Sequence, residues 1–157
     1  MPPHVTRLEP AFVGRGCETL TAAFERDPMS DYLFPGPRGR RRGLSRIFSC
    51  ELRYGLWRGE VDTAGRGDGL AIWFGPSHSA GAVAGLVRSG AWRVPLALGL
   101  RGTVRLLVLL RSIQVLHQRV ITQPHWYLLG LAVHPPPHSA TGRSAVGLAC
   151  QHGRGIV

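Results

Sequence analysis

A run of nine residues, HWYLLGLAV at positions 125–133, constrains the fold more than any other segment because it is almost continuously apolar. A run of this length and composition is typical of a central β-strand that is covered on both faces. Such a strand needs other strands to pair with it and helices to cover it. We therefore expect the rest of the chain to supply both.

Helical periodicity precedes this run. Three helices are predicted from apolar residues that recur every three to four positions, at residues 18–26, 37–57 and 95–120. The last of these is the longest, and its predicted apolar face consists of Leu106, Leu109, Leu110, Ile113, Leu116 and Val120. We interpret this face as the cover of a sheet.

Two short strands are predicted at residues 60–63 and 70–74, and the glycines at 65–69 suit a hairpin turn between them. Residues 29–35 are interpreted as a turn with buried aromatic side chains. The order of helices and strands predicts an α/β (α+β) fold in which helices flank a central sheet.

The charges of the chain are unevenly distributed. All 19 basic residues are arginine, the formal net charge is +10, and none of the nine acidic residues lies beyond Asp68. A site that needs two carboxylates, as acid and base or as metal ligands, therefore cannot be built from the C-terminal half. Cys17, Cys50 and Cys150 lack the close spacing of a zinc site, so we expect no metal.

The same features bear on location. The N-terminal residues lack the apolar segment of a secretory signal, and arginines interrupt the most apolar helix, so we expect neither secretion nor a membrane span. Three cysteines without a paired pattern favour a reducing compartment. We therefore expect a cytoplasmic protein.

Short motifs follow one another in a recognisable order, namely FERDP at 24–28, YLFP at 32–35, LRYG at 52–55, GEV at 59–61, AIW at 71–73, the leucine-rich helix, HWYL at 125–128 and LAV at 131–133. Across about residues 5–134 this series resembles bacterial members of the GNAT N-acetyltransferase superfamily. The resemblance implies a central mixed sheet flanked by helices, acetyl-coenzyme A as donor and a primary amine as acceptor.

The resemblance also implies how the coenzyme is bound. Leu131, Ala132 and Val133 match the end of the family's fourth strand, whose free backbone groups pair with the pantetheine arm. In the family, a Q-G-R-G-x-G loop follows this strand and opens a helix. Its backbone amides, together with the helix dipole, hold the pyrophosphate.

Two segments are candidates for this loop. The nearest match in composition consists of Gly153, Arg154, Gly155, Ile156 and Val157. Residues 141–147 are a second candidate, closer to the expected position but without the middle glycine. By chance, Gly-Arg-Gly triplets also arise in a chain rich in both residues, so a fortuitous match stays an alternative for each.

Tyr127 stands near the place where some members of the family carry a glutamate that acts as base. A tyrosine is an inefficient base at neutral pH because its ordinary pKa is about 10. We therefore weigh two roles for Tyr127, a catalytic one and a packing one.

Residues 1–134 are interpreted as the N-terminal part of an N-acetyltransferase domain, and residues 135–157 as an irregular tail that carries a degenerate coenzyme A loop. We expect the fold to be incomplete after the fourth strand, as in a truncated or frame-disrupted relative. The expected function is acetyl transfer from acetyl-coenzyme A to a primary amine. The alternative is a basic, non-enzymatic module that binds nucleic acid or another polyanion through clusters such as residues 38–42. No stacking aromatics interleave with that cluster, so we favour a solvated helix start over nucleic-acid binding.

Overall fold

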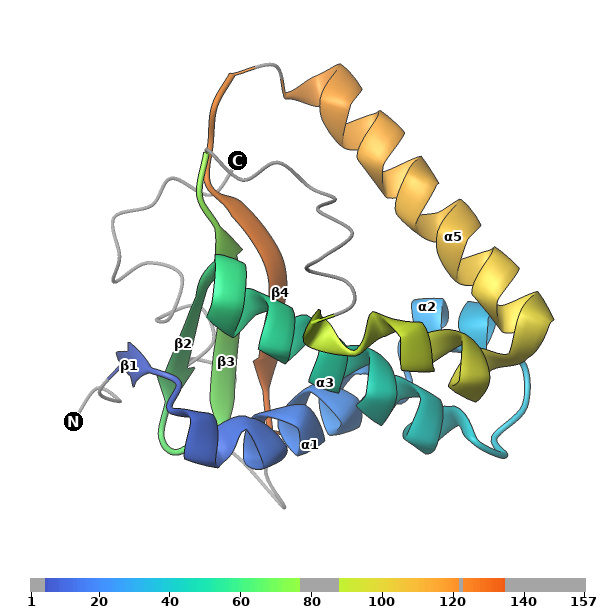
Figure 1. Cartoon of the computed structure of the whole chain (residues 1–157), viewed down its shortest axis with the longest axis horizontal. Helices are drawn as coiled ribbons and strands as arrows, with labels where there is room; N and C mark the ends of the chain where they lie inside the picture. The colour runs from blue at the N-terminus through green and yellow to red at the C-terminus, as the bar shows by residue number, and fades with distance from the viewer. Residues whose placement is uncertain (1–4, 77–87, 122, 135–157) are drawn as a thin grey trace.

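Small, β-branched and aromatic residues between positions 60 and 74 form the hairpin at the centre of the sheet. In a computed structural model, which describes residues 5–76, 88–121 and 123–134, strand β2 (Glu60–Ala64) pairs with β3 (Gly69–Phe74). Strand β1 (Val5–Arg7) flanks β2, and β4 (Tyr127–Val133) flanks β3 (Figure 1). The predicted strands at 60–63 and 70–74 are therefore confirmed, each longer by one residue.

Helices lie in both long connections. Between β1 and β2 lie a short 3-10 helix η1 (Pro10–Phe12) and the helices α1 (Val13–Phe24), α2 (Pro28–Leu33) and α3 (Arg40–Arg58). Between β3 and β4 lie a second 3-10 turn, η2 (Ala91–Arg93), and the long helix α5 (Val94–Val120). Together with the sheet they confirm the α+β class.

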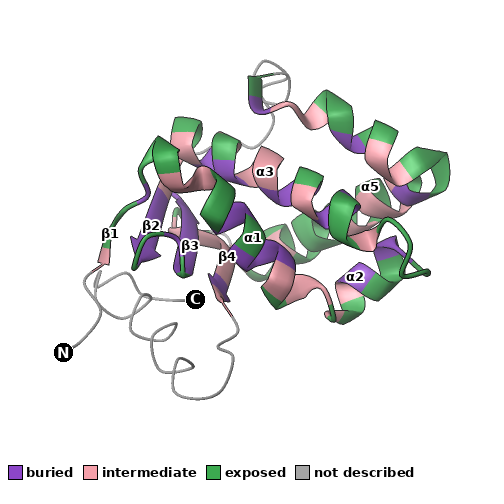
Figure 2. Cartoon of the chain, turned by 90° about the horizontal axis from the view of Figure 1, so that it is seen from below, coloured by how far each residue is buried: buried purple, intermediate pink, exposed green. Residues whose placement is uncertain are grey.

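The core lies between the sheet and the pair α1 and α3. Leu70, Ile72 and Phe74 point from β3 toward this pair and are almost fully buried, as Figure 2 shows for the strand. Leu20 of α1 and Leu52 of α3 meet them and are equally buried. Alternate residues of a strand share one face, so a single stripe of β3 anchors both helices.

The connection before α3 is helical where a turn was predicted. The carboxylate of Asp27 caps α2 by accepting a hydrogen bond from the backbone N–H of Met29, at 2.8 Å. Pro28 occupies the first helical position, where its missing N–H costs nothing. The helix predicted at 18–26 stops just before this proline, which disfavours a helix that continues through it but suits the start of the next one.

The predicted mixed sheet is not what the described residues form, because all three strand pairings are antiparallel. The prediction that residues 125–133 form a central strand is also wrong for this part of the chain. There, β4 pairs with β3 alone and lies at one edge of the sheet. Ala132 is its one buried residue, and the others are half-buried.

Helix α5 confirms the predicted helix at 95–120, but much of its predicted apolar face stays exposed. Gly99, with φ at 67°, kinks the helix. Leu106 and Leu109 pack against the core, whereas Leu116 and Val120 are 64% and 71% exposed. Figure 1 shows the C-terminal half of α5 standing away from the sheet.

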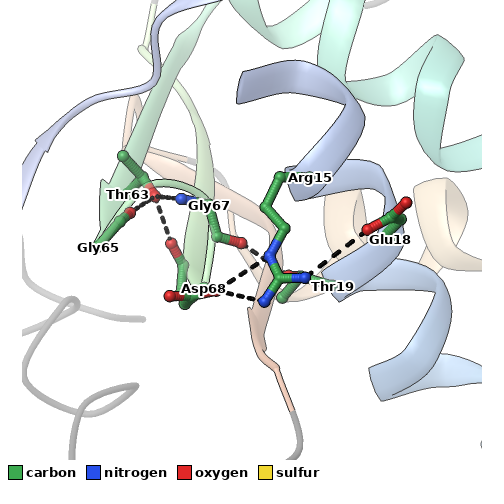
Figure 3. Close-up of polar contacts among 8 residues, drawn as sticks. Arg15, Glu18, Thr19, Thr63, Gly65, Gly67 and Asp68 are labelled. Carbon is green, nitrogen blue, oxygen red and sulfur yellow. Dashed lines mark hydrogen bonds and ion pairs between the residues drawn. The ribbon is translucent and has the colours of Figure 1, made fainter. Parts of the chain in front are cut away.

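The β2–β3 turn is tied to α1 by polar contacts (Figure 3). Thr63 Oγ1 accepts a hydrogen bond from the N–H of Gly67 at 3.0 Å, and Thr19 Oγ1 of α1 donates to the carbonyl of Gly67 at 2.7 Å. Arg15 of α1 forms an ion pair of 2.9 Å with Asp68. Gly67 has φ at 102°, so a side chain there would be strained.

Candidate functional site

A cavity of about 540 Å³ lies between the C-terminal half of α5 and the start of β4. Phe74 closes it from β3, Ile113 and His117 from α5, and His125 and Tyr127 from the segment that enters β4. The structure thus places Tyr127, the candidate from the sequence, in the wall of a cavity. His117 of α5 lies in the same wall, although α5 precedes β4 in the chain.

Two histidines in this cavity form a directed hydrogen-bond chain. Nδ1 of His125 lies 2.7 Å from the carbonyl oxygen of Gln123, and Nε2 of His125 lies 2.7 Å from Nε2 of His117. A carbonyl oxygen can only accept a hydrogen bond, so Nδ1 of His125 carries a proton and donates the hydrogen bond to Gln123. When His125 is neutral its Nε2 accepts, and His117 donates. Nδ1 of a neutral His117 is then an acceptor.

Tyr127 lies beside this pair, with its ring centroid 4.8 Å from that of His117. Burial raises the pKa of Tyr127 above its ordinary value, and the negative charge of Glu51 raises it further. The phenol therefore stays protonated at neutral pH. It can donate a hydrogen bond or a proton, but it cannot act as a general base.

Glu51 of α3 is the acidic group that acts on Tyr127. The residue is half-buried, and the loss of hydration on burial raises the pKa of its carboxyl group from 4.5 to about 7. No described residue forms a hydrogen bond or an ion pair with it. A carboxyl group that titrates near neutral pH is suited to take up and release protons.

The sequence interpretation missed Glu51, although a signal was present. In α3 it follows Ile47 by four positions and Phe48 by three, and it precedes Leu52. Residues at this spacing share one helix face, so Glu51 is an acid in the middle of the apolar face. An acid in such a position is rarely buried without a reason. His117 gave no comparable signal, because its place depends on how α5 returns to β4.

Strand β4 is irregular beside the cavity. Ile72 pairs with Gly130 and Trp73 pairs with Leu128, so Leu129 is an extra residue in β4. This is the geometry of a β-bulge, which bends a strand and is frequent next to active sites. The bulge lies between Tyr127 and the predicted coenzyme-binding residues.

Three of the predicted coenzyme-binding residues lie in β4. Leu131, Ala132 and Val133 pair there with Ala71, Leu70 and Gly69 of β3. In an antiparallel strand the N–H and C=O of one residue point to the same edge, and successive residues alternate. At least one of the three therefore directs its backbone groups away from β3. In the described part of the chain no strand pairs with that edge.

The remaining predicted coenzyme-binding residues, Gly153, Arg154, Gly155, Ile156 and Val157, lie outside the described residues, as does the second candidate loop at 141–147. Among the described residues no group of three or more His, Cys, Asp or Glu side chains could hold a metal ion. In the same part of the chain, no helix has both the length and the apolar character needed to cross a membrane.

No protein-family model matches the chain, and no curated protein matches it.

Proposed function

We propose that the chain is the N-terminal part of an acyltransferase domain that transfers an acetyl group from acetyl-coenzyme A to a primary amine. One observation carries the proposal. A bulged strand, with one edge that no other described strand pairs with, runs past a cavity whose wall holds a protonated phenol, and this phenol feels the charge of an acid with a pKa of about 7. The ordered motifs of the sequence agree with it.

The residues present fit this donor. The pantetheine arm carries amide groups, and an extended amide chain can add to an open sheet edge by backbone hydrogen bonds. Leu131, Ala132 and Val133 supply that edge. The resemblance assigns the pyrophosphate to the loop of Gly153–Val157.

Acetyl-coenzyme A supplies the acetyl group as a thioester, and the residues of the chain move the protons. Glu51, as carboxylate, accepts a proton from the ammonium form of the acceptor, which leaves a nucleophilic amine. As the new amide forms and the thiolate leaves, Tyr127 donates its proton to the sulfur, and the nitrogen of the new amide gives its surplus proton to the resulting tyrosinate. Glu51 releases its proton to solvent before the next turnover, and His117 packs against the ring of Tyr127 and holds it in place.

The proposal predicts thermal stabilisation by the donor. Acetyl-coenzyme A at about 100 times its dissociation constant should stabilise the folded chain by about 2.7 kcal/mol. For a chain of this size that raises the melting temperature by roughly 5–10 °C, measured by scanning calorimetry. Adenosine 3′,5′-bisphosphate, which lacks the pantetheine arm, is the control and should give a smaller shift.

The outcome of the same experiment separates the two functions considered from the sequence. No shift at millimolar acetyl-coenzyme A, together with salt-sensitive retention on heparin, would contradict acetyl transfer. It would support the basic binding module instead. A shift with acetyl-coenzyme A that exceeds the shift with the bisphosphate supports the proposed function.

A further inference from the structure

A second and larger cavity, of about 960 Å³, opens on the polar side of α3, between that helix, Glu18 of α1 and residues 89–93. Its lining is dominated by arginine side chains, which are Arg38, Arg41, Arg42, Arg46, Arg53 and Arg93. Against these six, Glu18 is the one carboxylate among the described lining residues. The cavity is therefore strongly positive.

Little of this charge is neutralised within the described part of the protein. Arg41 forms an ion pair with Glu25 at 3.0 Å. The other five arginines of the lining form no ion pair with a described residue, and all five are exposed. Arg93 instead lies over the ring of Trp92, at 4.8 Å from the centroid.

The arrangement opposes the stability of the free protein. Arg42 and Arg46 are four residues apart in α3, so two like charges are neighbours on one helix face. The first turn of α3 contains no acidic residue, although the positive end of the helix dipole lies there. A bound anion would relieve both effects, and a concave surface concentrates the attraction.

The lining also indicates the chemistry of the ligand. Guanidinium groups bind phosphate oxygens in pairs, which makes clustered arginines suited to several phosphate groups at once. None of the described lining residues is aromatic, so they offer no ring on which the bases of a single strand could stack. A hollow is also the wrong shape to enter a groove of duplex DNA.

We propose that this cavity is a binding site for a compact anion with several phosphate groups, either a free oligophosphate or the phosphate tail of a nucleotide. The sequence interpretation took residues 38–42 as a solvated helix start. Of these, Arg38, Arg41 and Arg42 are exposed and face a common hollow with Arg46, Arg53 and Arg93, whereas Arg40 is half-buried and forms an ion pair with Asp31. The site is independent of the proposed acetyl transfer, because it lies on the side of α3 opposite Glu51.

The test is calorimetric titration of the full chain with tripolyphosphate at low salt. The double variant Arg42→Gln/Arg46→Gln removes two lining charges. Arg111→Gln/Arg119→Gln removes two exposed charges of α5 outside the cavity and is the matched control. Loss of the charged contacts should weaken binding by about 10- to 100-fold in the first variant, while the control changes by less than about 3-fold. Circular dichroism of each variant verifies folding.

Each further result decides the proposal. Equal losses in both variants, or no binding by the unchanged chain, would overturn it, because binding would then reflect net charge or be absent.

Titration with ATP distinguishes the sources of the phosphates. Affinity for ATP equal to or above that for tripolyphosphate identifies a nucleotide tail, and weaker affinity identifies a free oligophosphate. A short single-stranded RNA that binds much tighter and displaces tripolyphosphate would overturn the choice of a small anion. Displacement by coenzyme A would show that the cavity belongs to the coenzyme site, whereas simultaneous binding supports a separate site.

Discussion

Glu51→Gln is expected to make the protein more stable than the wild type at about pH 8, while at about pH 4 the two should be equally stable. The reason is the burial of the carboxyl group, which raises its pKa from 4.5 to about 7. The folded chain therefore binds a proton that the unfolded chain has released. The contribution of protonated Glu51 to the free energy of unfolding is fully present below the pKa of the unfolded chain, 4.5. It is lost as the pH rises through the folded-state pKa of about 7.

The expected gain has an upper limit of about 3 kcal/mol, because part of the residue is exposed and solvent reduces the effect. Urea unfolding of both proteins across this pH range measures it. The free energy of unfolding of the wild type should fall relative to that of the variant as the pH rises. Parallel curves would show that Glu51 is hydrated in the folded state and would contradict its assignment as a base.

The same substitution should remove acetyl transfer, since the loss of a general base lowers rates by about 10²- to 10⁴-fold. The wild-type rate should rise with pH around 7, as Glu51 loses its proton, and the residual rate of the variant should lack this rise. Glu9→Gln, which changes an exposed acid outside both cavities, is the control and should leave the rate and its pH dependence unchanged. An unchanged rate in Glu51→Gln would exclude Glu51 as the base.

Gly59→Ala is expected to destabilise the fold by about 3 kcal/mol, at the upper end of the cost of overpacking. Gly59 ends α3 where the chain enters β2, and a Cβ there would overlap the backbone carbonyl oxygen of Trp73 and the ring of Phe74. A carbonyl inside a strand pairing cannot swing aside as a side chain can. The helix or the ladder between Glu60 and Trp73 must shift instead.

Gly14→Ala is the control for this prediction. Gly14 lies in α1 with no atom near its missing Cβ, so alanine should be neutral or stabilise by about 0.5–1 kcal/mol. Urea unfolding compares the two variants. Equal stability of Gly59→Ala and the wild type would show that α3 and β3 are not in close contact at this point.

The sequence predicts where helices and strands lie in the chain better than it predicts which elements they pack against or pair with. Periodicity located the hairpin of β2 and β3 and the long helix α5, because these patterns are local. Within the described residues it failed for 125–133, where an apolar run was interpreted as a central strand, because the number of partners on each side is a property of the whole sheet. It also failed for α2, since Asp27-Pro28 suits both the end of one helix and the start of another.

In the candidate site, too, local patterns identified some residues, whereas others depend on how the helices pack against the sheet. Tyr127 was a candidate from its place in the series of motifs, and the structure puts it in a cavity wall. The hydrogen bond between His117 and His125 depends on how α5 returns to the sheet, which no local pattern encodes. Glu51 was detectable from its place on the apolar face of α3, but its proximity to Tyr127 follows from the packing of α3 against the sheet.

Hydrogen–deuterium exchange in the presence of acetyl-coenzyme A tests the central proposal most directly. Exchange of backbone amides slows where a ligand adds hydrogen bonds or restricts local opening. Saturating acetyl-coenzyme A should slow exchange in peptides that cover Tyr127–Val133, and peptides that cover the arginines of α3 should exchange as before. Unchanged exchange along β4 at saturation would contradict the account, because the donor would then bind elsewhere or not at all.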